Sequence, residues 1–189
     1  MKHAFKEWAV ICKALAEGRQ AIVLRKGGIA EKDGLFRPEH TSFWLYPTYL
    51  HQQEKGIKAE ALPLLEAVNA EKPAAGTVCL SHYVEVPGVY HVNDLTPLLL
   101  LAPLHLWSEE TVKQRFAYRQ PGLYVLPVRV HRALQTVKVT ETPEYAGCKS
   151  WVELDQDLST AGAKPVLDDD AFQEVMRKLD ALLNPTALA

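Results

Sequence analysis

The chain has 189 residues, of which 48% are hydrophobic and 23% are charged, and its formal net charge is -2. This composition is typical of a folded globular domain, and the length is enough to bury a core without disulfides or metal. The slightly acidic balance excludes a broad positive face that grips many phosphates, but a local basic site remains compatible with it.

The three cysteines, Cys12, Cys79 and Cys148, are widely spaced and form no Cys-x-x-Cys pair, which indicates reduced thiols in a cytoplasmic protein. The N-terminal residues 1–15 have an amphipathic pattern with charged and aromatic side chains, unlike the uninterrupted apolar core of a signal peptide. The longest apolar run, residues 98–103, is too short to span a membrane. We therefore expect a soluble, cytoplasmic protein without a membrane partner.

The first half of the chain predicts helices and strands in succession. Apolar residues at helical spacing predict an amphipathic helix over 5–16. Short apolar runs predict strands over 20–24 and 42–46. A helix is expected over 63–71, with its proline tolerated in the first turn. Alternating residues predict a strand over 77–86 that turns into a hairpin with a strand over 89–92.

The second half adds further elements. Residues 95–101 are compatible with a buried helix or a buried strand. Ser108 is typical of a helix N-cap. A strand over 123–130 is expected to pair with 136–140. A final helix is expected to begin after 168–170 and to carry one apolar stripe.

Irregular alternation of these elements indicates an α+β fold. We expect a single domain over residues 1–154, with a mixed, largely antiparallel sheet flanked by helices. A linker and a C-terminal amphipathic helix would follow over 155–189. The apolar stripe of this helix could dock on a protein partner or on a second copy, forming a homo-oligomer.

A basic corner made of Arg25, Lys26, Gly27 and Gly28 follows the first predicted strand, over residues 20–24. Glycine lets backbone amides approach a phosphate, and arginine can pair with it in a bidentate manner. The alternative is a solvated turn in which the glycines only supply backbone freedom. Arg115, on a later helix, could flank the bound anion.

The aromatic strand that comes next could supply a stacking surface for a base. Regular alternation places Trp44 and Tyr46 on one face, and Phe43 and Leu45 on the other. The competing interpretation is that these rings belong to the core.

A divalent metal cofactor could be held by Glu39, His40 and His51, because imidazole and carboxylate suit zinc, iron or manganese. Alternatively, both histidines are ordinary loop and strand-end residues. Cys148 beside a lysine could be a nucleophile, or simply a small buried residue. Common phosphate-loop, dinucleotide, zinc-protease and serine-elbow motifs are absent from the sequence, so whether the protein is an enzyme stays open.

Several segments resemble one family along nearly the whole domain, from Phe5 to Leu154. They are KEWAVICKALAEGRQAIVLRKGGIAE, EHTSFWLYPTYLHQ, HLWSEETVKQRFAYRQPGLYVLPVRVHR and YAGCKSWVEL. These strings resemble the bacterial domain-of-unknown-function family 1802. Some members of this family are fused to or associated with Mrr-type restriction endonuclease domains. The resemblance implies a role linked to restriction-modification or nucleic-acid processing, and it brings no catalytic residues.

A strand, a glycine-containing loop and a Trp-x-x-Pro strand are also similar in layout to the Nudix hydrolases. The chain lacks their Arg-Glu-x-x-Glu-Glu helix, since residues 59–71 offer only Glu60, Glu66 and Glu71. Three hypotheses follow. The first is a nucleic-acid recognition module that uses Arg25, Lys26, Trp44, Tyr46 and Arg115. The second is a metal-dependent hydrolase of a phosphate or nucleotide substrate, and the third is a protein-interaction module without chemistry.

Overall fold

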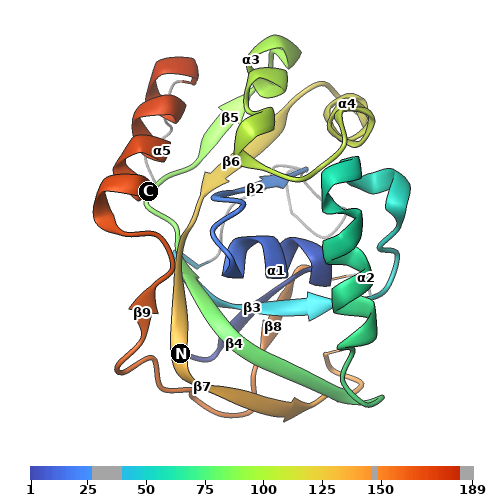
Figure 1. The fold of residues 1–189 in the computed structure, drawn as a ribbon, viewed down its shortest axis with the longest axis vertical. Coiled ribbons are helices and arrows are strands. Elements are labelled where there is room, and N and C mark those ends of the chain that lie inside the picture. The colour runs from blue at the N-terminus through green and yellow to red at the C-terminus, as the bar shows by residue number, and fades with distance from the viewer. Residues whose placement is uncertain (27–39, 146–148, 184–189) are drawn as a thin grey trace.

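The structure is a computed structural model that describes residues 1–26, 40–145 and 149–183. It confirms the α+β fold, with two sheets rather than one (Figure 1). The larger sheet has the strand order β8-β1-β3-β4-β7-β9 and the smaller one β2-β6-β5. The strands are β1 His3–Trp8, β2 Ile22–Arg25, β3 Ser42–Thr48, β4 Thr77–Glu85, β5 Tyr90–Val92, β6 Leu123–Pro127, β7 Arg129–Thr140, β8 Trp151–Glu153 and β9 Lys164–Pro165.

Strands β1 and β3 are parallel, and the other strand pairs of the described residues are antiparallel. The chain passes from the smaller to the larger sheet at Val128, which is buried and donates its N–H to the Ala21 carbonyl. The helices are α1 Ala9–Ala16, α2 Leu62–Ala70, α3 Leu95–Leu100, α4 Glu109–Ala117 and α5 Asp169–Leu182, and short 3-10 turns cover Glu54–Gly56, Ala59–Ala61 and Ala102–Leu104.

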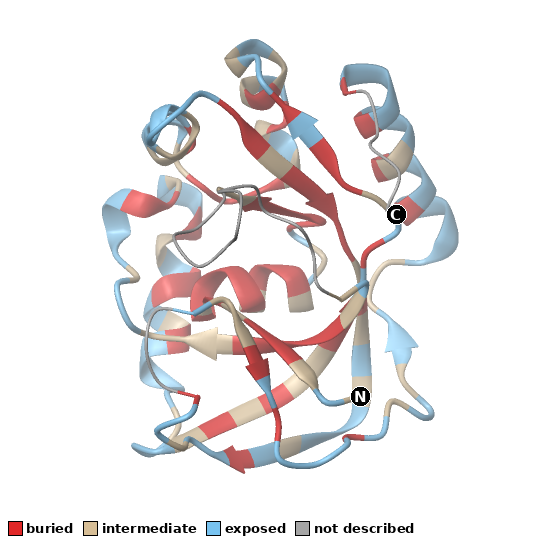
Figure 2. Ribbon diagram, turned by 180° about the vertical axis from the view of Figure 1, so that it is seen from behind, coloured by how far each residue is buried: buried red, intermediate tan, exposed pale blue. Residues whose placement is uncertain are grey.

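Helix α1 lies between the two sheets and is buried on nearly all sides (Figures 1 and 2). Its sequence, AVICKALA, is apolar around most of its circumference, as a fully enclosed helix requires. Side chains of α1, of the smaller sheet and of one face of β3 form the main core. A second, smaller core lies on the opposite face of the larger sheet.

The predicted helix over 5–16 is wrong in its first half. Residues His3–Trp8 form β1, because Ala4–Trp8 pair in parallel with Trp44–Thr48 of β3. Apolar residues at spacings of three and four fit a helix, but pairing with a distant strand decides the conformation here. The strand leads directly into α1 at Trp8, which is the N-cap of the helix.

The predicted hairpin is also wrong, because β4 pairs with β3 and β7 whereas β5 joins the smaller sheet beside β6. Residues 136–140 are part of β7, which pairs with β4 and not with the strand over 123–127. Residues Leu95–Leu100 resolve as helix α3, whose N-cap Asp94 accepts the Thr96 N–H.

The predicted caps and faces agree with the structure. Ser108 caps α4 and Asp168 caps α5, each accepting a backbone N–H with its side chain. The apolar stripe of α5 packs on the chain's own main core through Val175, Leu179 and Leu183. In the described part of the chain, no helix combines the length and the apolarity needed to cross a membrane.

Candidate functional site: a basic cleft

A cleft of about 690 Å³ opens where the ends of β1, β2 and β3 meet residues 72–79 and helix α4. We call it the basic cleft, because five lysine or arginine side chains line it against two carboxylates. The cations are Lys6, Arg25, Lys72, Arg115 and Lys149, and the carboxylates are Glu7 and Glu141. Aromatic walls come from Trp8, Tyr46 and Tyr49. Concavity, aromatic walls and convergent polar groups are features of ligand sites, and the number of charges here favours a charged ligand.

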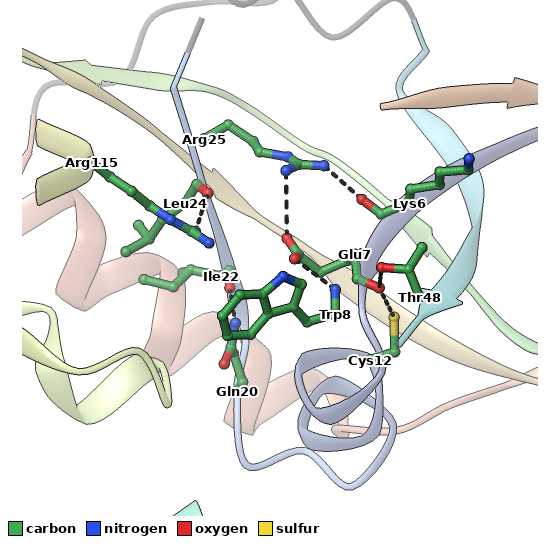
Figure 3. A network of polar contacts seen from close by, with 10 residues as sticks. All are labelled: Lys6, Glu7, Trp8, Cys12, Gln20, Ile22, Leu24, Arg25, Thr48 and Arg115. Carbon is green, nitrogen blue, oxygen red and sulfur yellow. Dashed lines mark hydrogen bonds and ion pairs between the residues drawn. The ribbon is translucent and has the colours of Figure 1, made fainter. Parts of the chain in front are cut away.

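Glu7 lies deep in this site, with its side chain only 2% exposed (Figure 3). Its Oε1 accepts the Trp8 N–H at 2.8 Å, while Oε2 has no hydrogen-bond partner among the described residues. The hydroxyl of Thr48 and the thiol of Cys12 both donate to the Glu7 carbonyl, at 3.3 and 3.7 Å. Two side chains therefore hold the backbone carbonyl of Glu7 in place. Of its two carboxylate oxygens, only Oε1 has a hydrogen-bond partner among the described residues.

Arg25, the last residue of β2, reaches over β1 towards this carboxylate (Figure 3). Its Nη2 donates to the Lys6 carbonyl at 2.7 Å, and its guanidinium lies 4.0 Å from the centroid of the Phe5 ring. Its Nη1 lies 3.9 Å from Glu7 Oε2, an ion pair without a hydrogen bond. Its buried Nε has no hydrogen-bond partner in the described ranges.

Arg115 approaches the same region from α4. Its guanidinium stacks 3.7 Å from the centroid of Trp107 and donates to the Leu24 carbonyl at 3.4 Å. Burial lowers the pKa of Arg115 to about 10, with Glu7 opposing and Arg25 reinforcing the shift. At neutral pH the side chain remains charged, so the two arginines and Glu7 form one partly buried charge cluster.

Tyr46 faces the cleft from β3, and its hydroxyl donates to Glu141 Oε1 at 3.1 Å. Burial and this carboxylate raise the pKa of Tyr46, so the phenol stays protonated. The Lys6 ammonium lies 5.5 Å from the centroid of this ring and also donates to the Tyr145 carbonyl. The Lys72 ammonium likewise lies over an aromatic ring, 5.2 Å from the centroid of Tyr49.

The structure brings together only some of the residues proposed for anion and base binding. Arg25, Tyr46 and Arg115 line the basic cleft. Trp44 does not, because it is fully buried in the second core. Trp44 and Tyr46 share one face of β3, and Phe43 and Leu45 share the other, as predicted.

Lys26 has a different environment from its neighbour. Its ammonium donates to the carbonyls of Phe116, Gln120 and Gly122. Burial lowers the pKa of Lys26. The cation therefore ties β2 to the end of α4 and uses its donors within the protein. Gly27 and Gly28, the rest of the predicted basic corner, lie outside the described residues.

The two histidines proposed as metal ligands do not converge. His40 precedes β3 and stacks on His3 with ring centroids 3.4 Å apart, whereas His51 follows β3 and lines the basic cleft. A seven-residue strand separates the two histidines by roughly 20 Å, too far for one ion. Glu39 lies outside the described residues, among which no group of three or more potential ligands occurs.

A second cleft of about 570 Å³ shares Pro47, Tyr49, Pro73 and Cys79 with the basic cleft. It also contains a hydrogen bond of 2.8 Å between Ser81 Oγ and His82 Nδ1. Arg132 Nε donates to His82 Nε2 at 3.5 Å. A neutral imidazole that accepts at Nε2 carries its proton at Nδ1, so it cannot remove the serine proton.

Thiol chemistry at Cys12, which lines this second cleft, is equally disfavoured. Burial and nearby Glu7 raise the pKa of Cys12 well above its ordinary value, which keeps the thiol protonated and unreactive. Cys148, the cysteine considered as a nucleophile, lies outside the described residues.

Sequence reasoning missed Glu7, which is the most informative residue of the site. A helix over 5–16 would have put this glutamate in an ordinary charged position. Its burial follows from the parallel pairing of Glu7 with Pro47, which no local pattern reveals. The flanking residues Lys6 and Trp8 do not by themselves indicate that Glu7 is buried.

The chain belongs to the DUF1802 family, a domain of unknown function, whose profile matches residues 4–178. Crystal structures of an ASCH protein from Zymomonas mobilis show a distant likeness in fold. The first is 12% identical, with 96% of this chain and 95% of that chain covered and a TM-score of 0.46. A mutant of the same protein is 9% identical, with 96% and 98% covered and a TM-score of 0.48. Likeness at this level carries no information about function. A search among curated proteins finds no match.

Proposed function

We propose that this protein is a nucleic-acid-binding module whose basic cleft holds the phosphate backbone. The observation that supports this proposal is the concentration of five cations around one cleft in a chain whose net charge is -2. Arginine and lysine that converge on a hollow form an attractive potential for phosphates even when the rest of the surface is acidic.

The cations have distinct parts in this proposal. Lys72 and Lys149 are exposed at the cleft, where flexible ammonium groups suit phosphates of varying position. Arg25 and Arg115 are held by stacking on Phe5 and Trp107, which fixes their orientation before a ligand enters. Tyr49 and Trp8 offer rings against which an unpaired base can stack.

Fluorescence anisotropy with labelled RNA, single-stranded DNA and duplex DNA at two salt concentrations tests the proposal. We expect the affinity to fall as the salt concentration rises. On a single strand, each neutralised phosphate contributes about -0.7 to the slope of log binding constant against log salt concentration. The double variant Lys72→Ala, Lys149→Ala should bind more weakly and flatten this slope by roughly 1.4.

A matched control replaces two exposed lysines elsewhere, in the double variant Lys55→Ala, Lys138→Ala. It has the same net charge as the cleft variant, so it should lose far less affinity. Absence of binding at low salt, or equal losses in the two double variants, would refute the placement of phosphates in the basic cleft.

We further propose that the module serves as an accessory part of a restriction-modification-like system. This link is supported by the family resemblance alone. Duplexes with and without methylated bases, compared in the same anisotropy experiment, test it. A consistent preference for one methylation state supports the link, whereas equal affinities argue against it.

A further inference from the structure

The pairing of Glu7 and Arg25 at the cleft is incomplete. Their closest charged atoms are 3.9 Å apart, longer than any hydrogen bond between a guanidinium and a carboxylate. Glu7 Oε2 and Arg25 Nε are both buried and lack hydrogen-bond partners among the described residues. Buried polar atoms are nearly always satisfied in folded proteins. Two unsatisfied atoms of opposite character, on residues whose charged groups lie 3.9 Å apart at a cleft, therefore point to a ligand group.

The chemistry of the pair restricts what that group can be. Arg25 offers only donors, and Glu7, with its Oε1 already held by the Trp8 N–H, offers an acceptor. A phosphate has only acceptors and would be repelled by the carboxylate. The complementary ligand must present acceptors towards Arg25 and donors towards Glu7 along one continuous edge.

Among the nucleobases, guanine presents this order most fully. Its N7 and O6 are adjacent acceptors, which arginine pairs with in a bidentate manner. The next positions along the same edge, N1–H and N2–H₂, are donors, which a carboxylate accepts. Adenine places a donor where O6 lies in guanine, and so opposes Arg25.

The surroundings suit an unpaired base rather than a base pair. Trp8, Tyr46 and Tyr49 line the same cleft, and sequence-specific reading of N1–H requires a base that is not paired. Lys72 and Lys149 lie at the cleft to hold the adjoining phosphates. The backbone of Glu7 is fixed by Thr48 and Cys12, so the carboxylate is oriented before binding.

We propose that the basic cleft recognises an unpaired guanine in single-stranded nucleic acid, with Arg25 donating to its acceptors and Glu7 accepting from its donors. This inference rests on the proposed nucleic-acid binding and adds to it the identity of the base. Glu7 is accordingly a specificity-determining residue, while the lysines give affinity without sequence preference.

The first experiment alters the ligand and leaves the protein unchanged. Labelled nine-nucleotide oligouridines with a single central substitution are compared by anisotropy at one salt concentration. The central base is guanine, hypoxanthine, 7-deazaguanine or adenine. Hypoxanthine lacks the N2 donors, and 7-deazaguanine lacks the N7 acceptor. We expect roughly tenfold weaker binding for each analogue and a larger loss for adenine.

The second experiment alters Glu7. In Glu7→Gln the side chain keeps its shape, and we expect the preference for guanine over hypoxanthine to fall from tenfold to about twofold. Glu141→Gln is the matched control, because it removes the same charge from another carboxylate of the same cleft and should keep the preference. Thermal unfolding shows whether the Glu7→Gln variant is folded. If this variant does not fold, the series of substituted oligouridines, measured on the unchanged protein, tests guanine recognition.

The outcomes separate the two proposals. Binding that is equal for all four oligonucleotides but weakened in the Lys72→Ala, Lys149→Ala variant overturns guanine recognition and keeps nucleic-acid binding. A guanine preference that Glu7→Gln leaves intact also overturns the role of Glu7. Absence of binding to every oligonucleotide at low salt overturns both. A guanine preference that Glu7→Gln abolishes and Glu141→Gln retains establishes the inference.

Discussion

The two clefts of this protein share a wall, yet their polar groups are used differently. In the second cleft, Lys13 pairs with Glu17 and Glu71, and His82 bonds to Ser81 and Arg132. In the basic cleft, Glu7 and Arg25 face each other without closing a hydrogen bond. The two clefts therefore differ in how their polar groups are partnered rather than in how many polar residues line them, and this difference is the reason for placing the proposed site in the basic cleft.

Replacing one arginine in each cleft should give the largest difference in oligonucleotide affinity between the two clefts. Arg25→Met keeps much of the packing on Phe5 and removes the charge, and we expect oligonucleotide affinity to fall 30-fold or more, about 2 kcal/mol. Arg132→Met in the second cleft should change affinity less than twofold. Titrations of both variants by anisotropy check this expectation, and similar losses in the two would contradict it.

Acid should weaken the fold through groups outside the basic cleft. Burial and neighbouring cations lower the pKa of His105 and of His82 to about 4. Because the unfolded chain binds these protons near pH 6.5, stability falls as the pH drops from 6.5 towards 4. We expect a loss of about 2 kcal/mol between pH 7 and pH 5 for fully buried His105, and less for His82.

Urea unfolding at the two pH values measures this loss. His82→Gln should reduce the dependence on pH and leave the contribution of His105. Arg115 keeps its charge throughout, because its pKa of about 10 lies far above this range. A stability that is unchanged from pH 7 to pH 5 would contradict the burial of both neutral histidines.

Tyr46→Phe should lower the free energy of unfolding by a smaller amount. The hydroxyl donates to Glu141, whose side chain belongs to an exposed residue, so its loss should cost about 0.5 to 1 kcal/mol. The free energy of unfolding in urea checks this value. Because the ring itself remains in the cleft, the salt dependence of oligonucleotide binding should stay the same, and a flattened slope would count against this division of roles.

Lys13→Ala should have the smallest effect of all. Its two carboxylate partners lie 3.4 and 4.0 Å away, at half-exposed or exposed positions, and such surface pairs contribute roughly 0.2 to 0.5 kcal/mol. Stability should fall by no more than that amount, and affinity should not change. A tenfold loss of affinity would mean that the ligand extends into the second cleft.

Local patterns predicted much of the fold and little of the site. The caps at Ser108 and Asp168, and the alternating faces of β3, follow from interactions within a few residues, so a single sequence reveals them. The pairing of β1 with β3 and the separation of β4 from β5 depend on contacts between distant segments. Such contacts leave no periodic trace in the chain.

The same limit explains the mixed outcome for the basic corner. The sequence pointed to Arg25 and Lys26 as two equivalent cations. Strand alternation sends their side chains to opposite sides, so Arg25 reaches the cleft while Lys26 reaches three carbonyls near the end of α4. The residue types indicated the region of the basic corner. Only the packing shows that Arg25 lines the cleft and that Lys26 joins β2 to the end of α4.

The bonds of Lys26 have a consequence for the entropy of binding. By joining β2 to the end of α4, this lysine sets the separation between Arg25 and Arg115 in the unliganded protein. Stacking of Arg25 on Phe5 and of Arg115 on Trp107 restricts the rotation of the two guanidiniums, so a ligand of the proposed site would meet them already ordered. Association through such a rigid pair carries a small loss of conformational entropy, which favours selective binding even where the contact area is modest.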